Sequence, residues 1–265
     1  MKLKIVSART GIVWVRLGIQ VFFKQPLALT GLFFLFMATL SVLNLVPILG
    51  SVVSLILLPT LGLGLMAAAQ RASQGSFPMP TVLLTGLRGP QASAKPLLLL
   101  GLIYTFWFCI IVALTALADG GEFARMFFLH GPQEEAAGNA AGMELPRGIF
   151  LFMLLHLPLS LAFWHAPALT HWHGIAPVKS LFFSLVGCWR NKGAYVVFGL
   201  AWFAVVMAEG IVVQILALLL NSSEVLVMGT YAVSLLTTSM FMCSVYFSFR
   251  DSFEADETLE ELPKP

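Results

Sequence analysis

Six long apolar runs dominate the chain, and each is long enough to cross the hydrocarbon core of a bilayer. They lie near residues 27–46, 48–69, 96–117, 148–164, 194–220 and 225–249. A transmembrane helix needs about 20 apolar residues, because backbone groups in lipid must be hydrogen-bonded within their own segment. We therefore predict an all-α, polytopic membrane protein with six transmembrane helices, forming a single integral membrane domain over residues 1–265.

The composition excludes several other classes of protein. Hydrophobic residues make up 58% of the chain and charged residues only 11%, whereas soluble domains have about 45–50% and about 25%. Such a chain cannot cover a water-facing surface, which excludes an ordinary soluble enzyme, a disordered protein and a nucleic-acid binder. No Gly-rich phosphate loop, zinc motif or nucleophile elbow occurs in a suitable context. We therefore expect no catalytic residues, no metal and no cofactor, and we interpret the protein as not an enzyme.

The positive charges are distributed very unevenly between the connections. Thirteen of the 15 Lys and Arg residues precede the first run, follow the last, or lie in the two even-numbered connections. Only Arg125 and Arg147 lie on the other side. Cytoplasmic loops carry the excess of Lys and Arg, so we predict that both termini lie in the cytoplasm. Residues 118–147 then form a periplasmic loop, and residues 251–265 form an acidic cytoplasmic tail.

Two segments, residues 7–24 and 177–192, have the pattern of amphipathic helices. In the first, a basic stripe lies opposite a face that contains Trp14 and Phe22. A helix of this kind is typical of the membrane interface, where anionic lipids of the inner leaflet attract basic residues. The alternative is that the apolar face packs on the protein's own spans. The candidate lipid-headgroup contacts in the two segments are Arg9, Arg16, Lys24, Lys179, Arg190 and Lys192.

The same layout is repeated three times along the chain. Each amphipathic segment leads through a basic residue and a helix starter or breaker into a span, at Lys24-Gln25-Pro26, Lys95-Pro96 and Lys192-Gly193. A shorter segment, residues 80–87, precedes the third span. We therefore predict three units, each an interfacial helix followed by a membrane hairpin.

Glu209 is the most informative polar residue, because it lies near the middle of the fifth apolar run. A carboxylate at that depth costs about 2.5–3.5 kcal/mol, and such residues usually face a bundle interior or water. Two interpretations remain open: a proton or cation site, or a protonated carboxyl group that bridges two helices. The candidate partners for this intramembrane polar site are His156, Tyr231, Thr237 and Thr238.

The histidines near the end of the fourth run do not have the spacing of a metal site. His171 and His173 would project about 200° apart on a helix, and His156 and His165 about 180° apart. Metal-binding pairs on helices are usually four residues apart, on one face. We therefore expect these side chains to belong to the interfacial end of a span rather than to bind a metal.

Six segments carry a resemblance to known proteins: Gly11–Trp14, Phe23–Pro26, Ala118–Gly121, Pro177–Ser184, Cys188–Asn191 and Ser248–Phe253. In these segments the chain resembles a family of six-span inner-membrane proteins from beta-proteobacteria. The resemblance covers most of the chain and implies the six-span fold and the inner membrane, without an assigned activity. The repeated layout is also loosely similar to the membrane domain attached to some glycerophosphodiester phosphodiesterases.

Two functional hypotheses follow. The first is a non-catalytic membrane organiser or regulator that acts through lipid or protein contacts, with anionic lipids of the cytoplasmic face and a membrane protein as partners. The second is a small permease or channel for a solute or a lipid, with Glu209 in the pathway. In the second case, Glu209→Gln should abolish transport and leave assembly intact.

Overall fold

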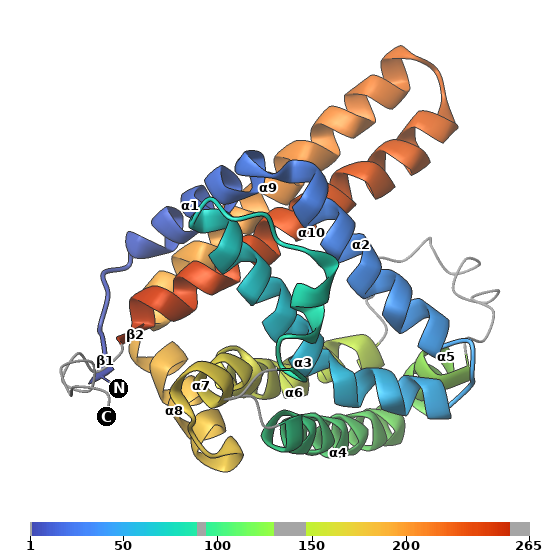
Figure 1. Cartoon of the computed structure of the whole chain (residues 1–265). Helices are drawn as coiled ribbons and strands as arrows, with labels where there is room; N and C mark the ends of the chain where they lie inside the picture. The colour runs from blue at the N-terminus through green and yellow to red at the C-terminus, as the bar shows by residue number, and fades with distance from the viewer. Residues whose placement is uncertain (1, 89–93, 130–146, 255–265) are drawn as a thin grey trace. The chain divides into compact units, whose positions relative to one another are not determined.

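The computed structural model describes residues 2–88, 94–129 and 147–254, which are almost entirely helical (Figure 1). The helices are α1 Thr10–Lys24, α2 Pro26–Leu43, α3 Leu49–Ser73, the 3-10 helix η1 Pro80–Leu84, α4 Ala94–Asp119, α5 Glu122–Leu129, α6 Arg147–Phe163, α7 Ala166–His173, α8 Pro177–Arg190, α9 Lys192–Leu219 and α10 Ser223–Ser252. Two short strands, β1 Lys2–Leu3 and β2 Phe253–Glu254, pair in antiparallel fashion near the two ends of the chain.

Six helical stretches of the described residues are long and apolar enough to cross a membrane. They are Pro26–Leu43, Leu49–Ser73, Ala94–Asp119, Gly148–His173, Lys192–Leu219 and Ser223–Ser252. The prediction of an all-α protein with six transmembrane helices is thereby confirmed. The last hairpin turns at Asn221 and Ser222, where the Ser222 side chain caps α10 by accepting a hydrogen bond from the Val225 backbone N–H.

The fourth span is longer than the expected run over residues 148–164, and it is interrupted. Helix α6 ends at Phe163, and α7 begins a new helix at Ala166 with Pro167 in its first turn. Proline is favoured there because its missing N–H is not needed at a helix start. Helix α7 ends at His173 and is capped by Gly174, whose φ of 64° lies in the left-handed region that favours glycine.

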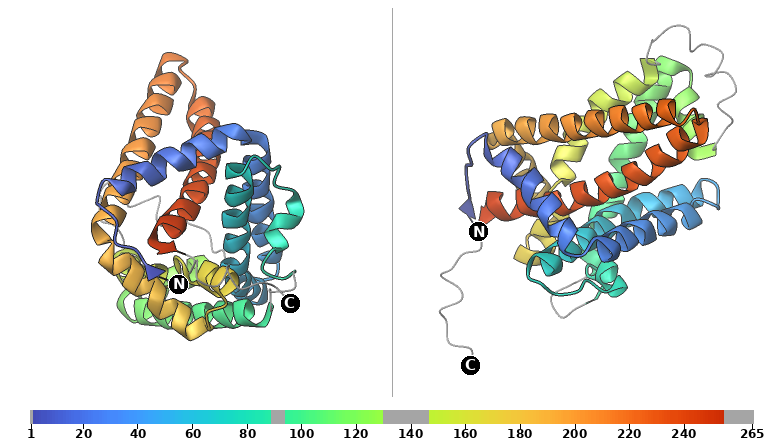
Figure 2. Two further views of the ribbon diagram at one scale, coloured as in Figure 1. Left: turned by 60° about the vertical axis from the view of Figure 1, so that its left-hand side comes forward. Right: turned by 90° about the horizontal axis from the view of Figure 1, so that it is seen from above.

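Contacts divide the chain into two compact units, which we describe separately. The first unit comprises Met1–Met37, Leu61–Gly89 and Val186–Pro265. In it, α1 runs obliquely across the hairpin of α9 and α10 and packs on both helices (Figure 2). Two glycines of α1 permit this approach: a Cβ on Gly11 would lie 2.7 Å from the Phe198 backbone nitrogen, and one on Gly18 would lie 2.5 Å from the Ser244 Cβ.

The second unit comprises Ala38–Thr60 and Pro90–Leu185, and α4 packs on α5, α6 and α7 within it. Its core is aromatic: Phe108 is 4% exposed and makes tilted and edge-to-face contacts with the rings of Phe127 in α5 and Phe152 in α6. Helix α5 lies within the segment we expected to be a plain periplasmic loop. Asp119 holds the start of this helix by accepting hydrogen bonds from the backbone N–H groups of Gly121 and Phe123. The rest of that loop, residues 130–146, lies outside the described residues.

Candidate functional site

The first amphipathic helix, α1, is attached to the protein rather than laid on lipid by its apolar face. Trp14 and Phe22 are 0% and 2% exposed, and the buried side of the helix faces α9 and α10. Arg9 and Arg16 lie on the exposed side, as the helical projection predicts. Lys24 is also exposed, and its Nζ donates a hydrogen bond to the Ser73 carbonyl at 3.2 Å. Of the two interpretations, packing on the protein's own spans therefore describes the apolar face of α1.

The second amphipathic helix, α8, presents its apolar face outward. Val178, Phe182, Leu185 and Trp189 are all exposed, between 38% and 68%. Their spacing of four, three and four residues places them on one helix face. Such a continuous apolar stripe is typical of a helix that lies in the membrane interface. We call these four residues the α8 stripe.

Small polar residues attach the opposite face of α8 to the protein. Ser180 and Ser184 are fully buried. The Thr170 hydroxyl donates to Ser180 Oγ at 3.0 Å, and the His165 backbone N–H donates to Ser184 Oγ at 2.9 Å. Ser184 in turn donates to the Leu161 carbonyl at 2.9 Å. Because these hydroxyls are bonded inward, the helix cannot rotate its stripe toward the protein without breaking buried hydrogen bonds.

Three basic side chains flank the α8 stripe. Lys179, Arg190 and Lys192 are all exposed. The Lys192 ammonium group lies 5.4 Å from the centre of the Trp189 ring, within the range of a cation–π interaction. A Trp ring beside a lysine is typical of the headgroup level of a membrane. The surroundings of the α8 stripe therefore fit a lipid surface with anionic headgroups.

The intramembrane polar site is smaller than the sequence predicts. The Thr237 hydroxyl of α10 donates to Glu209 Oε2 of α9 at 2.5 Å. Thr238 instead donates to the Ser234 carbonyl of its own helix, and Tyr231 is 74% exposed. His156 lies in the second unit and contacts the Tyr104 hydroxyl at 3.1 Å. Of the five residues predicted for this site, the contacts among described residues therefore bring together only Glu209 and Thr237.

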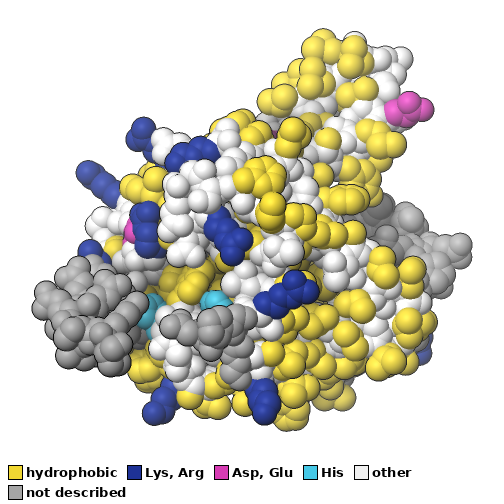
Figure 3. All heavy atoms as spheres, viewed as in Figure 1, with side chains coloured by type: hydrophobic (Ala, Val, Ile, Leu, Met, Phe, Trp, Pro, Cys, Tyr) yellow, Lys and Arg dark blue, Asp and Glu magenta, His cyan; other side chains and the backbone are white. Residues whose placement is uncertain are grey.

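The part of the α9–α10 hairpin that lies between its two basic ends, Lys192 and Arg250, offers no cation to balance a carboxylate at Glu209. Residues 193–249 contain no Lys or Arg. The half of the hairpin beyond α1 is covered largely by hydrophobic side chains, without the dark blue of basic residues (Figure 3). A hydrogen bond to a hydroxyl on the paired helix is the usual way to satisfy a polar side chain in lipid. This arrangement favours the helix-bridging interpretation of Glu209.

We therefore expect Glu209→Gln to retain the hairpin, because the amide oxygen can still accept from Thr237. Glu209→Leu and Thr237→Val should each lower the free energy of unfolding by about 0.6 kcal/mol and by no more than about 1.7 kcal/mol, the mean and the maximum for interhelical hydrogen bonds in membranes. Denaturation in mixed micelles, followed by circular dichroism, measures the effect. Loss of a transport activity in Glu209→Gln, with unchanged stability, would instead support the pathway hypothesis.

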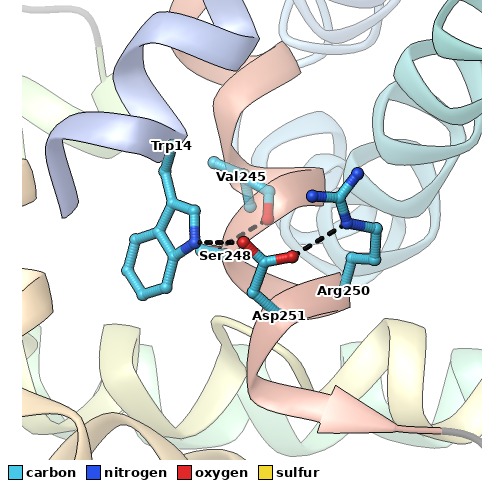
Figure 4. Close-up of polar contacts among 5 residues, drawn as sticks. All are labelled: Trp14, Val245, Ser248, Arg250 and Asp251. Carbon is cyan, nitrogen blue, oxygen red and sulfur yellow. Dashed lines mark hydrogen bonds and ion pairs between the residues drawn. The ribbon is translucent and has the colours of Figure 1, made fainter. Parts of the chain in front are cut away.

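Sequence reasoning missed the group of polar contacts at the end of α10. The Trp14 indole Nε1 donates to Asp251 Oδ2 at 3.0 Å, and the Arg250 Nε donates to Asp251 Oδ1 at 2.9 Å (Figure 4). Ser248 satisfies its hydroxyl within α10 by donating to the Val245 carbonyl at 2.8 Å. Both carboxylate oxygens of Asp251 are therefore bonded, one to each of two segments of the first unit.

Asn191 holds the first residues of the chain near the end of α10 by hydrogen bonds. It is 2% exposed, its Oδ1 accepts from the Val6 backbone N–H at 2.9 Å, and its Nδ2 donates to the Lys4 carbonyl at 3.0 Å. The Phe253 ring packs against Gly187. A Cβ at position 187 would lie 2.7 Å from Cζ of this ring, so a larger residue would clash with it. Residues 251–254 thus belong to the fold rather than to a solvated tail, and residues 255–265 lie outside the described part.

Three segments that carry the family resemblance meet at this point: Gly11–Trp14, Cys188–Asn191 and Ser248–Phe253. A probable inner membrane protein of Burkholderia thailandensis is 37% identical to the chain over 259 residues, which cover 97% of this chain and 96% of the relative. The chain belongs to the same family as this inner membrane protein. No family model matches it, and no solved structure matches it. The relationship confirms the resemblance, and with the six apolar helices it identifies a polytopic inner-membrane protein.

Proposed function

We propose that the protein is a non-catalytic organiser of the inner membrane that gathers anionic lipids around α8. The observation that carries this proposal is the outward α8 stripe, flanked by Lys179, Arg190 and Lys192. An exposed apolar helix face with a basic border binds a lipid surface both by burial and by attraction to anionic headgroups. The two serines that fix the opposite face hold α8 ready for this contact.

The proposal requires α8 on the cytoplasmic side, with both termini there. The support is the distribution of Lys and Arg, thirteen of 15 on one side of the six spans. Fusing a reporter of compartment to the chain tests this orientation. A reporter fused after residue 130 should report the periplasm, and reporters fused after residue 80 or 180 should report the cytoplasm. The opposite pattern of activities would reverse the orientation and place α8 on the outer leaflet.

The lipid contact is tested by neutralising the three basic residues that flank the α8 stripe together, as Lys179→Gln, Arg190→Gln and Lys192→Gln, which we call the triple α8 variant. Each basic residue near an anionic surface contributes about 1 kcal/mol, so the preference for anionic lipid should fall more than tenfold. Polymer-bounded nanodiscs are prepared from membranes of mixed composition, and mass spectrometry gives the ratio of phosphatidylglycerol to phosphatidylethanolamine in each variant.

The matched control removes the same charge elsewhere, as Arg71→Gln, Arg88→Gln and Lys95→Gln. These residues are exposed and belong to the same predicted side of the membrane, but they are spread over α3, the segment after η1 and α4 rather than set along one exposed apolar helix face. We expect the control to change the lipid ratio much less than the α8 variant. Equal lipid ratios in the wild type and the α8 variant would contradict the proposal.

A further inference from the structure

The outward side of α9 carries an amide side chain, that of Gln214, in the middle of an apolar surface. Gln214 is exposed, and so are its neighbours Val212, Ile215 and Leu216, between 46% and 55%. All four lie within a candidate membrane span. Gln214 precedes Asn221 of the hairpin turn by seven residues, which is about 10 Å along a helix axis. The amide therefore lies inside the apolar surface of the span rather than at its end.

Gln214 makes no hydrogen bond through its side chain within the part of the chain that the structure describes. Other polar residues of the hairpin are satisfied there. Glu209 accepts from Thr237 of the paired helix, and Thr230 donates to a carbonyl of its own helix. An amide in hydrocarbon loses its hydrogen bonds to water, and Gln side chains in membranes usually regain them by bonding to another helix. Gln214 thus calls for a partner beyond α9 and α10.

The amide belongs to a continuous line of exposed residues along α9. Phe203, Met207, Gly210 and Gln214 follow one another at spacings of four, three and four, which places them on one helix face. All four are exposed, and the half of the hairpin that contains Gln214 extends beyond α1 (Figure 1). Alternate spacings of four and three are those by which two helices interlock their side chains. We call these four residues the α9 seam.

Gly210 fits a close neighbour on this seam. Glycine is less favourable than alanine inside a helix, so its presence calls for a reason. A Cβ on Gly210 would meet no atom within 4 Å, and packing among the described residues therefore does not require glycine there. In membranes, small residues allow the backbone of a second helix to approach closely. A helix packed on the outer side of α9 would explain Gly210 and would also reach Gln214.

The chemistry of the α9 seam matches a second copy of the same chain. An amide carries both a donor and an acceptor, so two Gln214 side chains can exchange a pair of hydrogen bonds. Copies with the same orientation in a membrane are related by a twofold axis along the membrane normal, which brings identical residues together at the same depth. The seam carries no charge that would select a different partner. We propose that the protein forms a parallel homodimer through the α9 seam, in which the Nε2 of each Gln214 donates to the Oε1 of the other.

The dimer is tested by energy transfer between full chains that carry a donor or an acceptor fluorophore at the C-terminus. The chains are reconstituted together in phosphatidylethanolamine and phosphatidylglycerol liposomes, and the transfer is followed as lipid is added. The wild type should associate as dimers. Gln214→Leu should raise the dissociation constant about tenfold, because it removes both hydrogen bonds, and Gln214→Asn should associate more strongly than Gln214→Leu, because it keeps an amide.

Three further variants make the outcome decisive. Gly210→Leu should also weaken association about tenfold, because its side chain would overpack the close contact. Thr230→Val is the matched control, since Thr230 is an exposed polar residue of the same hairpin whose hydroxyl is already bonded, and it should associate as the wild type does. The triple α8 variant should too, so each proposal can fail without the other. A wild type that is monomeric at every dilution would mean that lipid or another part of the chain covers the seam, and would overturn the proposal.

Disulfide cross-linking then shows which face of α9 forms the contact. In a cysteine-free chain, Met207→Cys should link two copies on oxidation in liposomes. Val212→Cys should not, because position 212 projects about 160° away from position 214, although Val212 and Met207 are similarly exposed, at 55% and 47%. Links at position 212 without links at 207, or equal association of the wild type, Gln214→Leu and Gly210→Leu, would place the contact elsewhere and overturn the proposal.

Discussion

Trp14→Ala is expected to lower the free energy of unfolding by about 3–5 kcal/mol, the usual cost of deleting a buried aromatic side chain. Trp14 is fully buried between α1 and the α9–α10 hairpin, and its ring lies 5.2 Å from that of Tyr195 and 6.0 Å from that of Phe198. The substitution also leaves Asp251 without its indole partner. Unfolding in mixed micelles, followed by circular dichroism, measures the loss.

The matched control is Trp189→Ala, because Trp189 is 68% exposed on the α8 stripe. In micelles this variant should unfold like the wild type to within about 0.5 kcal/mol, as substitutions at exposed positions usually do. Trp14→Phe and Asp251→Ala, alone and combined, isolate the hydrogen bond by a double-mutant cycle, because each single substitution removes it. Equal losses in Trp14→Ala and Trp189→Ala would contradict the packing of α1 described above.

Gly11→Ala and Gly18→Ala should each destabilise the first unit by about 1–3 kcal/mol, the usual cost of overpacking a tight contact. The added Cβ atoms would meet backbone atoms: the Phe198 nitrogen at 2.7 Å for position 11, and the Ser244 Cα and nitrogen at 2.8 Å for position 18. Backbone cannot rotate aside as a side chain can, so α1 must move away from the hairpin. The same denaturation measurement gives the effect.

Gly199→Ala on α9 is the control for this pair. Its added Cβ would meet no atom within 4 Å, and alanine is the better helix former by about 1 kcal/mol. We therefore expect Gly199→Ala to be neutral or stabilising while the two α1 substitutions destabilise. If Gly18→Ala were as stable as Gly199→Ala, the close crossing of α1 over α10 would be wrong.

The sequence predicts the fold well because lipid allows few solutions. Backbone groups in the hydrocarbon core must be bonded within helices, so the apolar runs alone identify the six candidate spans. The helical projection also predicts which side of α1 carries Arg9 and Arg16. The projection does not tell what covers the apolar side of α1, because an apolar helix face packs equally well on protein or on lipid.

Tertiary contacts decide the rest. The α8 segment has the same amphipathic pattern as α1, but its serines are bonded inward and its apolar stripe is left exposed. His156 and Glu209 are both polar residues within spans, yet each satisfies its hydrogen bond with a nearby residue of its own unit. The hydrogen bond between Trp14 and Asp251 joins residues far apart in the sequence, so local periodicity gives no sign of it, whereas the Asp119 contacts that begin α5 are local.

The orientation of the α8 stripe toward lipid is measured most directly with nitroxide labels at positions 182 and 184 of a cysteine-free chain in lipid bilayers. Phe182 is 63% exposed, whereas Ser184 is fully buried. The label at 182 should collide readily with oxygen, which concentrates in lipid, and rarely with a water-soluble nickel complex, while the label at 184 should be shielded from both. A label at 182 that collides chiefly with the nickel complex would show that the stripe faces water and would contradict the proposed lipid contact.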